Sequence, residues 1–204
     1  QMLDDGFFNV EQWLAQEVQT EFSEKENTAF TLGDGSSKPK GFLAYATDVA
    51  GDKTRAFGTL QHRESSAVGS VSADDVIKLI YALKAAYRNG AAFMGSTDLL
   101  SDLMVLKDGN GQYLWRAGLE VGQSSTLRGY NFVENEDMPD VAAGALPLSF
   151  GNFQRGYTIV DRMGTRVLRD PYTNKPFVGF YTTKRVGGFV TDSQAIKLLK
   201  VKAA

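Results

Sequence analysis

The sequence predicts an α+β fold, with helices in the first half of the chain and short strands mainly in the second. Three segments carry apolar residues at helical spacing before residue 105, and apolar runs separated by glycines follow residue 145. Of the 204 residues, 43% are hydrophobic, 23% are charged and 21 are glycine. This composition is typical of a globular protein with a core of its own, and the glycines indicate many tight turns.

The first predicted helix spans residues 10–29. Asn9 can cap it, and Gln12 can bond back to the Asn9 N–H group. Its apolar stripe suits a helix lying across a sheet, while its opposite, acidic face is either solvated or used between subunits. Trp13 and Trp115 both lie in apolar patterns and are expected to be buried. The stripe consists of Val10, Trp13, Leu14, Val18 and Phe22.

The sequence GDGSSKPKGF, residues 33–42, follows this helix and has the residue types of a phosphate-binding loop. Such a loop needs four residues between its first glycine and a Gly-Lys-Ser or Gly-Lys-Thr triplet, and it opens a helix. Neither condition holds, because no Ser or Thr follows a Gly-Lys pair and the segment leads into the apolar run 41–45. A helix stop followed by a turn is therefore the better interpretation.

The second predicted helix begins after Ser72, which forms a capping box with Asp75, and it ends at the Asn-Gly pair at 89–90. Residues 46–70 before it lack a strong period, which suggests irregular loop and strand. The buried face of the helix consists of Val76, Ile77, Leu79, Ile80, Leu83 and Tyr87.

Short strands separated by glycines are predicted for most of the remaining chain. Residues 91–94 form the first, and Ser96 or Thr97 then caps a third helix with an apolar stripe. A turn at Gly187-Gly188 is expected near the end of the chain. The later strand candidates are 146–150, 157–160, 166–168, 177–183 and 195–201.

His62 is the only histidine, and the chain has no cysteine. Ser-His-Asp chemistry would have to use His62, and no Gly-x-Ser-x-Gly sequence supplies a serine. The same counts exclude disulfides, thiolate metal sites and multi-histidine metal sites. A catalytic role is therefore not predicted for His62, and no metal or cofactor is expected.

Two clusters of oxygen-bearing side chains have residue types found in cation-binding or acid-base sites. Asp108 and Asn110 imitate the start of a calcium loop, but its sixth and twelfth positions are Tyr113 and Leu119 instead of glycine and glutamate. A turn is predicted there. Residues 134–140 contain four carboxylates without a neighbouring His, Lys or Arg to tune a pKa. A solvated acidic turn is favoured over an enzyme site.

Charge and hydropathy give no broad reason to expect nucleic acid or a membrane as a partner. Lys and Arg number 22 and Asp and Glu 24, for a formal net charge of -2, although a basic face could exist within that balance. The sequence has no apolar run of about eighteen residues, and it does not begin with a basic segment followed by an apolar one. The expectation is a protein made in the cytoplasm.

Several separated stretches, in this order, resemble one known family. They are "LDDGFFNVEQWLAQEV" with "FSEKENTAFTLGDGSSKPKGFLAY", then "YNFVENEDMP", and last "DRMGTRVLRDPYTNKPFVGFYTTKRVGGFVTDSQAIKLLKV". From about Leu3 to Val201 the chain resembles the major capsid proteins of tailed bacteriophages that have the Hong Kong 97 type of fold. The resemblance implies a structural protein that is not an enzyme and needs no substrate or cofactor.

The resemblance also implies a domain organisation. Residues 1–70 would form a peripheral domain with a long spine helix, 71–168 an axial α/β domain, and 169–204 the strands that return to the peripheral sheet. Axial loops would meet around the centre of each pentamer or hexamer, and the loop 169–175 would lie between neighbouring capsomers. The candidate capsomer contacts are Arg169, Asp170, Tyr172, Asn174, Lys175, Asp108 and Asn110.

The implied function is that of a phage or prophage capsid subunit that associates with copies of itself into an icosahedral shell. The shell would enclose DNA without specific recognition, and it would assemble in the cytoplasm of the host bacterium to form the virion capsid. An encapsulin-type compartment is an alternative with the same fold, and an enzyme using residues 134–140 is a more distant one. The family's N-terminal arm and hairpin loop precede the spine helix and are expected to be missing here, as in a truncated chain.

Overall fold

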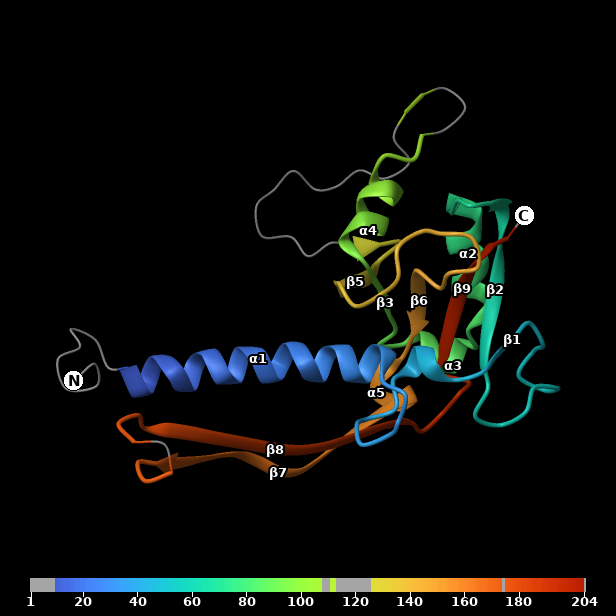
Figure 1. Cartoon of the computed structure of the whole chain (residues 1–204). Helices are drawn as coiled ribbons and strands as arrows, with labels where there is room; N and C mark the ends of the chain where they lie inside the picture. The colour runs from blue at the N-terminus through green and yellow to red at the C-terminus, as the bar shows by residue number, and fades with distance from the viewer. Residues whose placement is uncertain (1–9, 108–110, 113–125, 174, 204) are drawn as a thin grey trace. The chain divides into compact units, whose positions relative to one another are not determined.

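The computed structural model describes residues 10–107, 111–112, 126–173 and 175–203, and it divides into two compact units. The helix-ribbon unit contains α1 (Val10–Leu32) and most of a two-stranded ribbon, β7 (Tyr157–Asp170) and β8 (Gly179–Val190). The sheet unit contains the other elements around a seven-stranded sheet (Figure 1). The α+β class is therefore confirmed. The units comprise Gln1–Gly41 with Ile159–Phe189, and Phe42–Thr158 with Val190–Ala204.

Helix α1 spans Val10–Leu32, slightly further than predicted. Leu14, Val18 and Phe22 are half-buried at intervals of four residues and form its apolar stripe. Trp13 is 50% exposed, so its predicted burial is wrong. It precedes Leu14 by one position, which turns it about 100° around the helix away from that residue. Trp115 lies outside the described residues.

The glycine-rich segment after α1 is a turn, as predicted. Gly33 N donates to the Ala29 carbonyl at 3.0 Å, and Gly41 N donates to the Gly33 carbonyl at 2.8 Å. A Cβ atom on Gly33 would lie only 2.2 Å from the Pro39 carbonyl oxygen, so this close approach requires glycine. Lys40 N donates to the Gly188 carbonyl at 3.0 Å, which connects the turn to the ribbon.

The ribbon consists of two long strands, β7 (Tyr157–Asp170) and β8 (Gly179–Val190). The strands predicted at 157–160 and 166–168 are parts of β7. The turn predicted at Gly187-Gly188 is wrong, because both glycines lie inside β8. Gly188 is buried, and its carbonyl accepts a hydrogen bond from Lys40 N, so this residue continues the strand and does not form a turn.

The strands of the larger sheet lie in the order β1-β2-β9-β6-β3-β5-β4. The last strand of the chain, β9, is an interior strand: it pairs in parallel with β2 and antiparallel with β6. The domain organisation implied by the family resemblance places it instead among the strands that return to the peripheral sheet. The bounds are Thr47–Asp48 for β1, Leu60–Val68 for β2, Ala92–Gly95 for β3, Thr126–Leu127 for β4, Tyr130–Glu134 for β5, Leu148–Gly151 for β6 and Ile196–Lys202 for β9.

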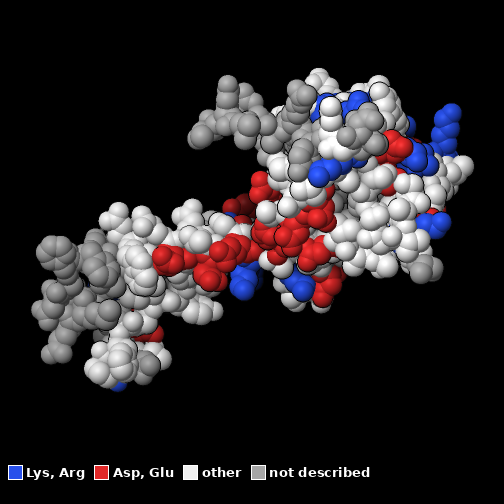
Figure 2. All heavy atoms as spheres, turned by 90° about the horizontal axis from the view of Figure 1, so that it is seen from above, with Lys and Arg blue, Asp and Glu red and all other residues white. Residues whose placement is uncertain are grey.

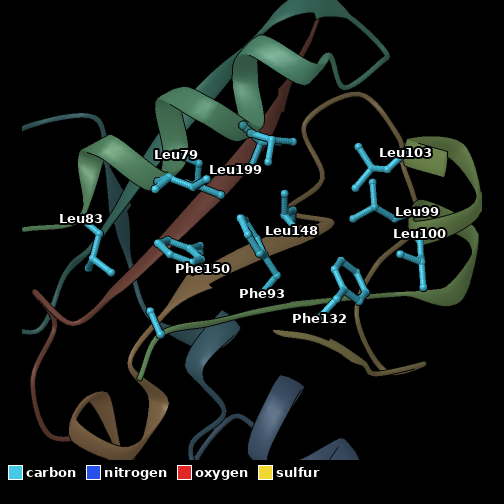
Figure 3. Close-up of a cluster of buried hydrophobic side chains, with 13 residues drawn as sticks. Leu79, Leu83, Phe93, Leu99, Leu100, Leu103, Phe132, Leu148, Phe150 and Leu199 are labelled. Atoms are coloured by element: carbon cyan, nitrogen blue, oxygen red, sulfur yellow. The ribbon is translucent and has the colours of Figure 1, made fainter. Parts of the chain in front are cut away.

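Hydrophobic clusters cover both faces of this sheet. On one face, Phe93 of β3 and Phe150 of β6 are fully buried with ring centroids 4.4 Å apart, and leucines of α2 and α4 pack over them (Figure 3). Burial of each such side chain contributes about 1.5 to 3 kcal/mol. A smaller cluster around Phe42 and Leu60 forms on the other face. The helical elements are η1 Phe42–Ala44, α2 Ala73–Ala82, α3 Ala85–Arg88, α4 Thr97–Met104 and α5 Phe153–Gly156.

The helix predicted to run to residues 89–90 is interrupted at Leu83. Leu83 has an extended backbone with ψ 132° and a fully buried side chain. Arg88 of the following short helix donates from Nε to the Leu83 carbonyl at 2.9 Å. The break in the helix allows the Leu83 side chain to enter the core. Tertiary packing therefore outweighs the helical spacing of apolar residues in the sequence.

The predicted capping residues Ser72 and Ser96 are both confirmed. Asp75 is 1% exposed, and its carboxylate accepts hydrogen bonds from the backbone N–H and hydroxyl groups of both Ser66 and Ser72, at 2.8 to 3.1 Å. Burial by itself would raise the pKa of Asp75, but these hydrogen bonds hold it below the usual value. The cap therefore also fastens α2 to the end of β2.

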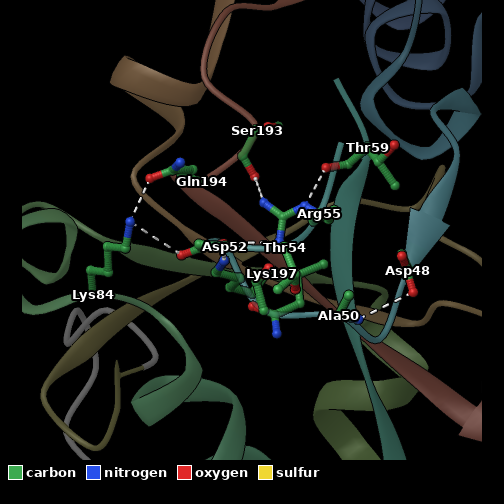
Figure 4. A network of polar contacts seen from close by, with 12 residues as sticks. Asp48, Ala50, Asp52, Thr54, Arg55, Thr59, Lys84, Ser193, Gln194 and Lys197 are labelled. Atoms are coloured by element: carbon green, nitrogen blue, oxygen red, sulfur yellow. Dashed lines mark hydrogen bonds and ion pairs between the residues drawn. The ribbon is translucent and has the colours of Figure 1, made fainter. Parts of the chain in front are cut away.

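A buried ionic network holds the loop before β2 against β9 (Figure 4). The Asp52 carboxylate contacts both Lys197 Nζ and Arg55 Nη1, the latter at 2.9 Å, and these three side chains are at most 6% exposed. Arg55 also donates to the carbonyls of Thr59 at 2.6 Å and Ser193 at 3.1 Å. Burial opposes ionisation of Asp52, yet the Lys197 and Arg55 contacts hold its pKa below the usual value.

Replacement of the buried carboxylate tests this network. Asp52→Ala leaves Lys197 and Arg55 buried without their anionic partner, so we expect the free energy of unfolding to fall by about 3 to 5 kcal/mol. Denaturant unfolding measures it. Asp48→Ala is the matched control, because Asp48 is an exposed aspartate near the start of the same loop, and it should cost about 1 kcal/mol or less. Equal losses in the two variants would contradict a special role for Asp52.

The cap at Asp75 predicts a dependence on pH. Because its folded pKa lies below the usual 3.8, the stability it contributes is present above that value and is lost as pH falls through the lowered pKa. Asp75→Asn should therefore be less stable than wild type by about 1 to 3 kcal/mol at neutral pH. The difference should shrink towards about pH 3. Chemical unfolding across this range measures it, with the exposed neighbour Asp74→Asn as control; a difference independent of pH would refute the assignment.

Candidate functional site

The single histidine is a buried residue of the sheet. His62 lies on β2 opposite Leu198 of β9 and is 6% exposed. Burial, together with the positive charge of Lys200, lowers its pKa. Its Nδ1 atom has no hydrogen-bond partner among the described residues. These surroundings favour a neutral imidazole enclosed by the sheet.

The acidic segment 134–140 begins at the end of β5 and is held by local contacts. The Thr97 hydroxyl donates to Glu134 Oε2 at 3.2 Å and also to Glu136. Asn135 is buried and accepts from Asp137 N at 3.0 Å, and Met138 is buried in the core. In the described part of the chain, no three His, Cys, Asp or Glu side chains are grouped so that they could hold a metal ion. The segment therefore acts as an anchored connection with acidic groups at its surface.

The predicted contact loop is the turn that joins β7 to β8. Asp170 Oδ1 accepts from the backbone N–H groups of Tyr172 at 2.9 Å and Thr173 at 3.2 Å, and its Oδ2 accepts from the Thr173 hydroxyl. The Thr173 hydroxyl and these two N–H groups lower the pKa of Asp170. Tyr172 is 79% exposed. Asp170 thus organises a turn that presents an aromatic side chain to solvent.

The structure brings four of the seven predicted contact residues together at this end of the ribbon. Arg169 and Lys175 are exposed beside Asp170 and Tyr172. The other three, Asn174, Asp108 and Asn110, lie outside the described residues.

The ribbon leaves much apolar surface uncovered. Two paired strands alone are marginally stable in water, and this ribbon keeps large exposed apolar side chains although α1 packs beside it. Contiguous exposed apolar surface is also a mark of a protein interface. The exposed large apolar residues, each 48–79% accessible, are Ile159, Val160, Val167, Leu168, Tyr172, Phe177, Tyr181 and Phe189.

Charge is divided between the two parts of the helix-ribbon unit. Helix α1 has five glutamates and one lysine, whereas residues 157–190 have six Lys or Arg and two Asp. Figure 2 shows a row of acidic side chains along this unit. An ion pair of 2.5 Å joins Lys184 of β8 to Glu26 of α1. This division is hidden in the net charge of -2 because opposite charges cancel over the whole chain; counting the charges of each predicted helix and strand separately reveals it.

No described helix has both the length and the apolar composition needed to cross a membrane.

Solved structures with the same fold are assembled shells. The capsid of the empty GTA particle is 43% identical, with a TM-score of 0.90, over 99% of this chain and 69% of that chain. The capsid of the native GTA particle is 42% identical, with a TM-score of 0.91 and the same coverage. No curated protein sequence matches the chain.

More distant structures share the fold alone. A structure from Gordonia phage Cozz is 15% identical, with a TM-score of 0.60, over 96% of this chain and 64% of that chain. The SrpI encapsulin from Synechococcus elongatus PCC 7942 is 13% identical, with a TM-score of 0.65, over 98% of this chain and 69% of that chain. Residues 1–201 match the phage capsid family. The chain therefore belongs to the phage capsid family, with the Hong Kong 97 type of fold that its sequence resembles.

Proposed function

We propose that this protein is a shell subunit that associates with copies of itself into pentamers, hexamers and an icosahedral capsid. The observation that carries the proposal is the 43% identity to the GTA capsid over 99% of the chain. The ribbon supports it independently, since its apolar side chains are 48–79% exposed and a second copy could cover them. The role is structural and involves no substrate.

The enclosed cargo is proposed to be DNA, held without sequence recognition. A formal net charge of -2 suits a shell that encloses nucleic acid without binding it tightly along its whole inner surface. Assembly would take place in the cytoplasm of a bacterial host, and the product would be the virion capsid. The encapsulin alternative has less support, because that match is 13% identical and reflects the fold alone.

We assign the helix-ribbon unit to the peripheral domain and the sheet unit to the axial domain. This assignment keeps α1 as the spine helix but moves the domain boundaries to the neighbourhood of residues 41, 158 and 189. The strand β9 then belongs to the axial domain. In this arrangement the turn with Arg169, Tyr172 and Lys175 is the contact between neighbouring capsomers.

The full chain is expected to form large closed particles as its concentration is raised. Light scattering after size exclusion gives their mass, and negative-stain electron microscopy shows whether they close. A chain that stays monomeric at every concentration tested would contradict the proposed function.

A single aromatic substitution tests the contact loop. Tyr172→Ala should weaken particle formation, because a largely exposed aromatic residue is the kind of side chain that anchors interfaces. Stability of the isolated chain should change by about 0.5 kcal/mol or less, since the side chain is solvated there. Tyr81→Ala is the matched control, because Tyr81 is 69% exposed on α2. Equal effects of the two substitutions on the assembled fraction would argue against the loop as a capsomer contact.

A further inference from the structure

Helix α1 carries an acidic stripe distinct from its apolar stripe. Glu17, Glu21 and Glu24 are all exposed, and spacings of four and three residues place them on one face. Trp13, four residues before Glu17 and 50% exposed, extends the same face. A third stripe of the helix is exposed and uncharged. That third stripe contains Gln16, Gln19 and Ser23.

The ribbon presents a complementary surface. On β8, exposed Tyr181 and Arg185 alternate with half-buried side chains. One of the half-buried side chains is Lys184, which pairs with Glu26 of α1, so Tyr181 and Arg185 belong to the other face of the strand. Arg162 and Arg185 also border the groove between α1 and the ribbon. The basic ribbon surface, as we name it, consists of the exposed residues Arg162, Arg166, Tyr181, Arg185 and Phe189.

We propose that the acidic stripe of one copy binds the basic ribbon surface of a second copy. Within one copy, α1 meets the ribbon through its apolar stripe and Glu26, so Glu17, Glu21 and Glu24 point elsewhere. A second copy can supply what each surface lacks: positive charge for the stripe, and an aromatic side chain and negative charge for the ribbon. The inference rests on the proposed function and names the surfaces that perform it.

The two surfaces are different, so the contact is heterologous: it leaves one copy with an unused ribbon surface and the other with an unused acidic stripe. Such contacts propagate until a rotation closes them, which suits a ring or a shell. Aromatic burial of Trp13 and Tyr181 would provide affinity. The opposed charges would fix register and reject wrong pairings.

Mixing two charge-reversed chains tests the pairing. In Glu17→Lys/Glu21→Lys both surfaces are basic, and in Arg166→Glu/Arg185→Glu both are acidic. Each variant alone should assemble about tenfold more weakly than wild type, because like charges then face one another. An equimolar mixture should recover association into assemblies in which the two chains alternate, such as hexamers, since each reversed surface then meets its opposite on the other chain. A contact within one copy would stay repulsive in the mixture, so recovery identifies contact between copies.

The uncharged stripe provides the matched control. Gln16→Lys/Gln19→Lys adds the same number of lysines to the same region of α1 but leaves both surfaces intact, so it should assemble by itself. In its mixture with Arg166→Glu/Arg185→Glu, the fraction of the arginine-reversed chain found in particles should not rise. Circular dichroism and thermal unfolding verify that each variant folds. If wild type assembles but the mixture of reversed chains does not, the pairing is wrong while the capsid function stands, and the ribbon's positive charge is then left for the enclosed nucleic acid. If wild type itself never assembles, both proposals fail.

Discussion

The sheet unit depends on the insertion of the last strand of the chain between β2 and β6. Residues 196–202 pair with both neighbours and bury Ile196, Leu198 and Val201 completely. Without β9, the pair β1 and β2 would be separated from the other four strands. The buried contact of Lys197 with Asp52 then fixes the loop before β2 to the same strand. Folding of this unit therefore requires contacts between distant parts of the sequence. Such contacts form slowly, because the intervening chain must first be closed into a loop.

This topology explains why the ribbon can be long and exposed without unfolding the rest. The chain leaves the sheet unit after Thr158 and returns at Val190, so the ribbon is an excursion between two segments of that unit. The sheet has hydrophobic clusters on both faces, whereas the ribbon has large apolar side chains in solvent. The sheet unit buries its core within a single chain, whereas the helix-ribbon unit leaves apolar surface that partners could cover. This difference is expected of a subunit that assembles into a shell.

Local signals in the sequence predicted much of the fold. The capping serines Ser72 and Ser96, the turn after α1 and the class of fold follow from short-range chemistry. Features that depend on distant partners could not be predicted this way. Leu83 breaks its helix to enter the core, Gly188 stays in a strand because Lys40 pairs with it, and Asp52 finds Lys197 far along the chain. For the candidate site, the family resemblance predicted the contact loop around Tyr172. The opposite charges of α1 and the ribbon could not be recognised until each charged residue was assigned to its helix or strand.

Hydrogen exchange of the ribbon before and after assembly tests most directly whether this unit is completed by other copies. Two-stranded pairing alone protects amides weakly, whereas a seven-stranded sheet with a buried core protects them strongly. The account predicts fast exchange in β7 and β8 of the dissociated chain, strong protection there in assembled particles, and little change in β6 and β9. Equal protection of the ribbon in both states would contradict it, because the ribbon would then need no neighbour.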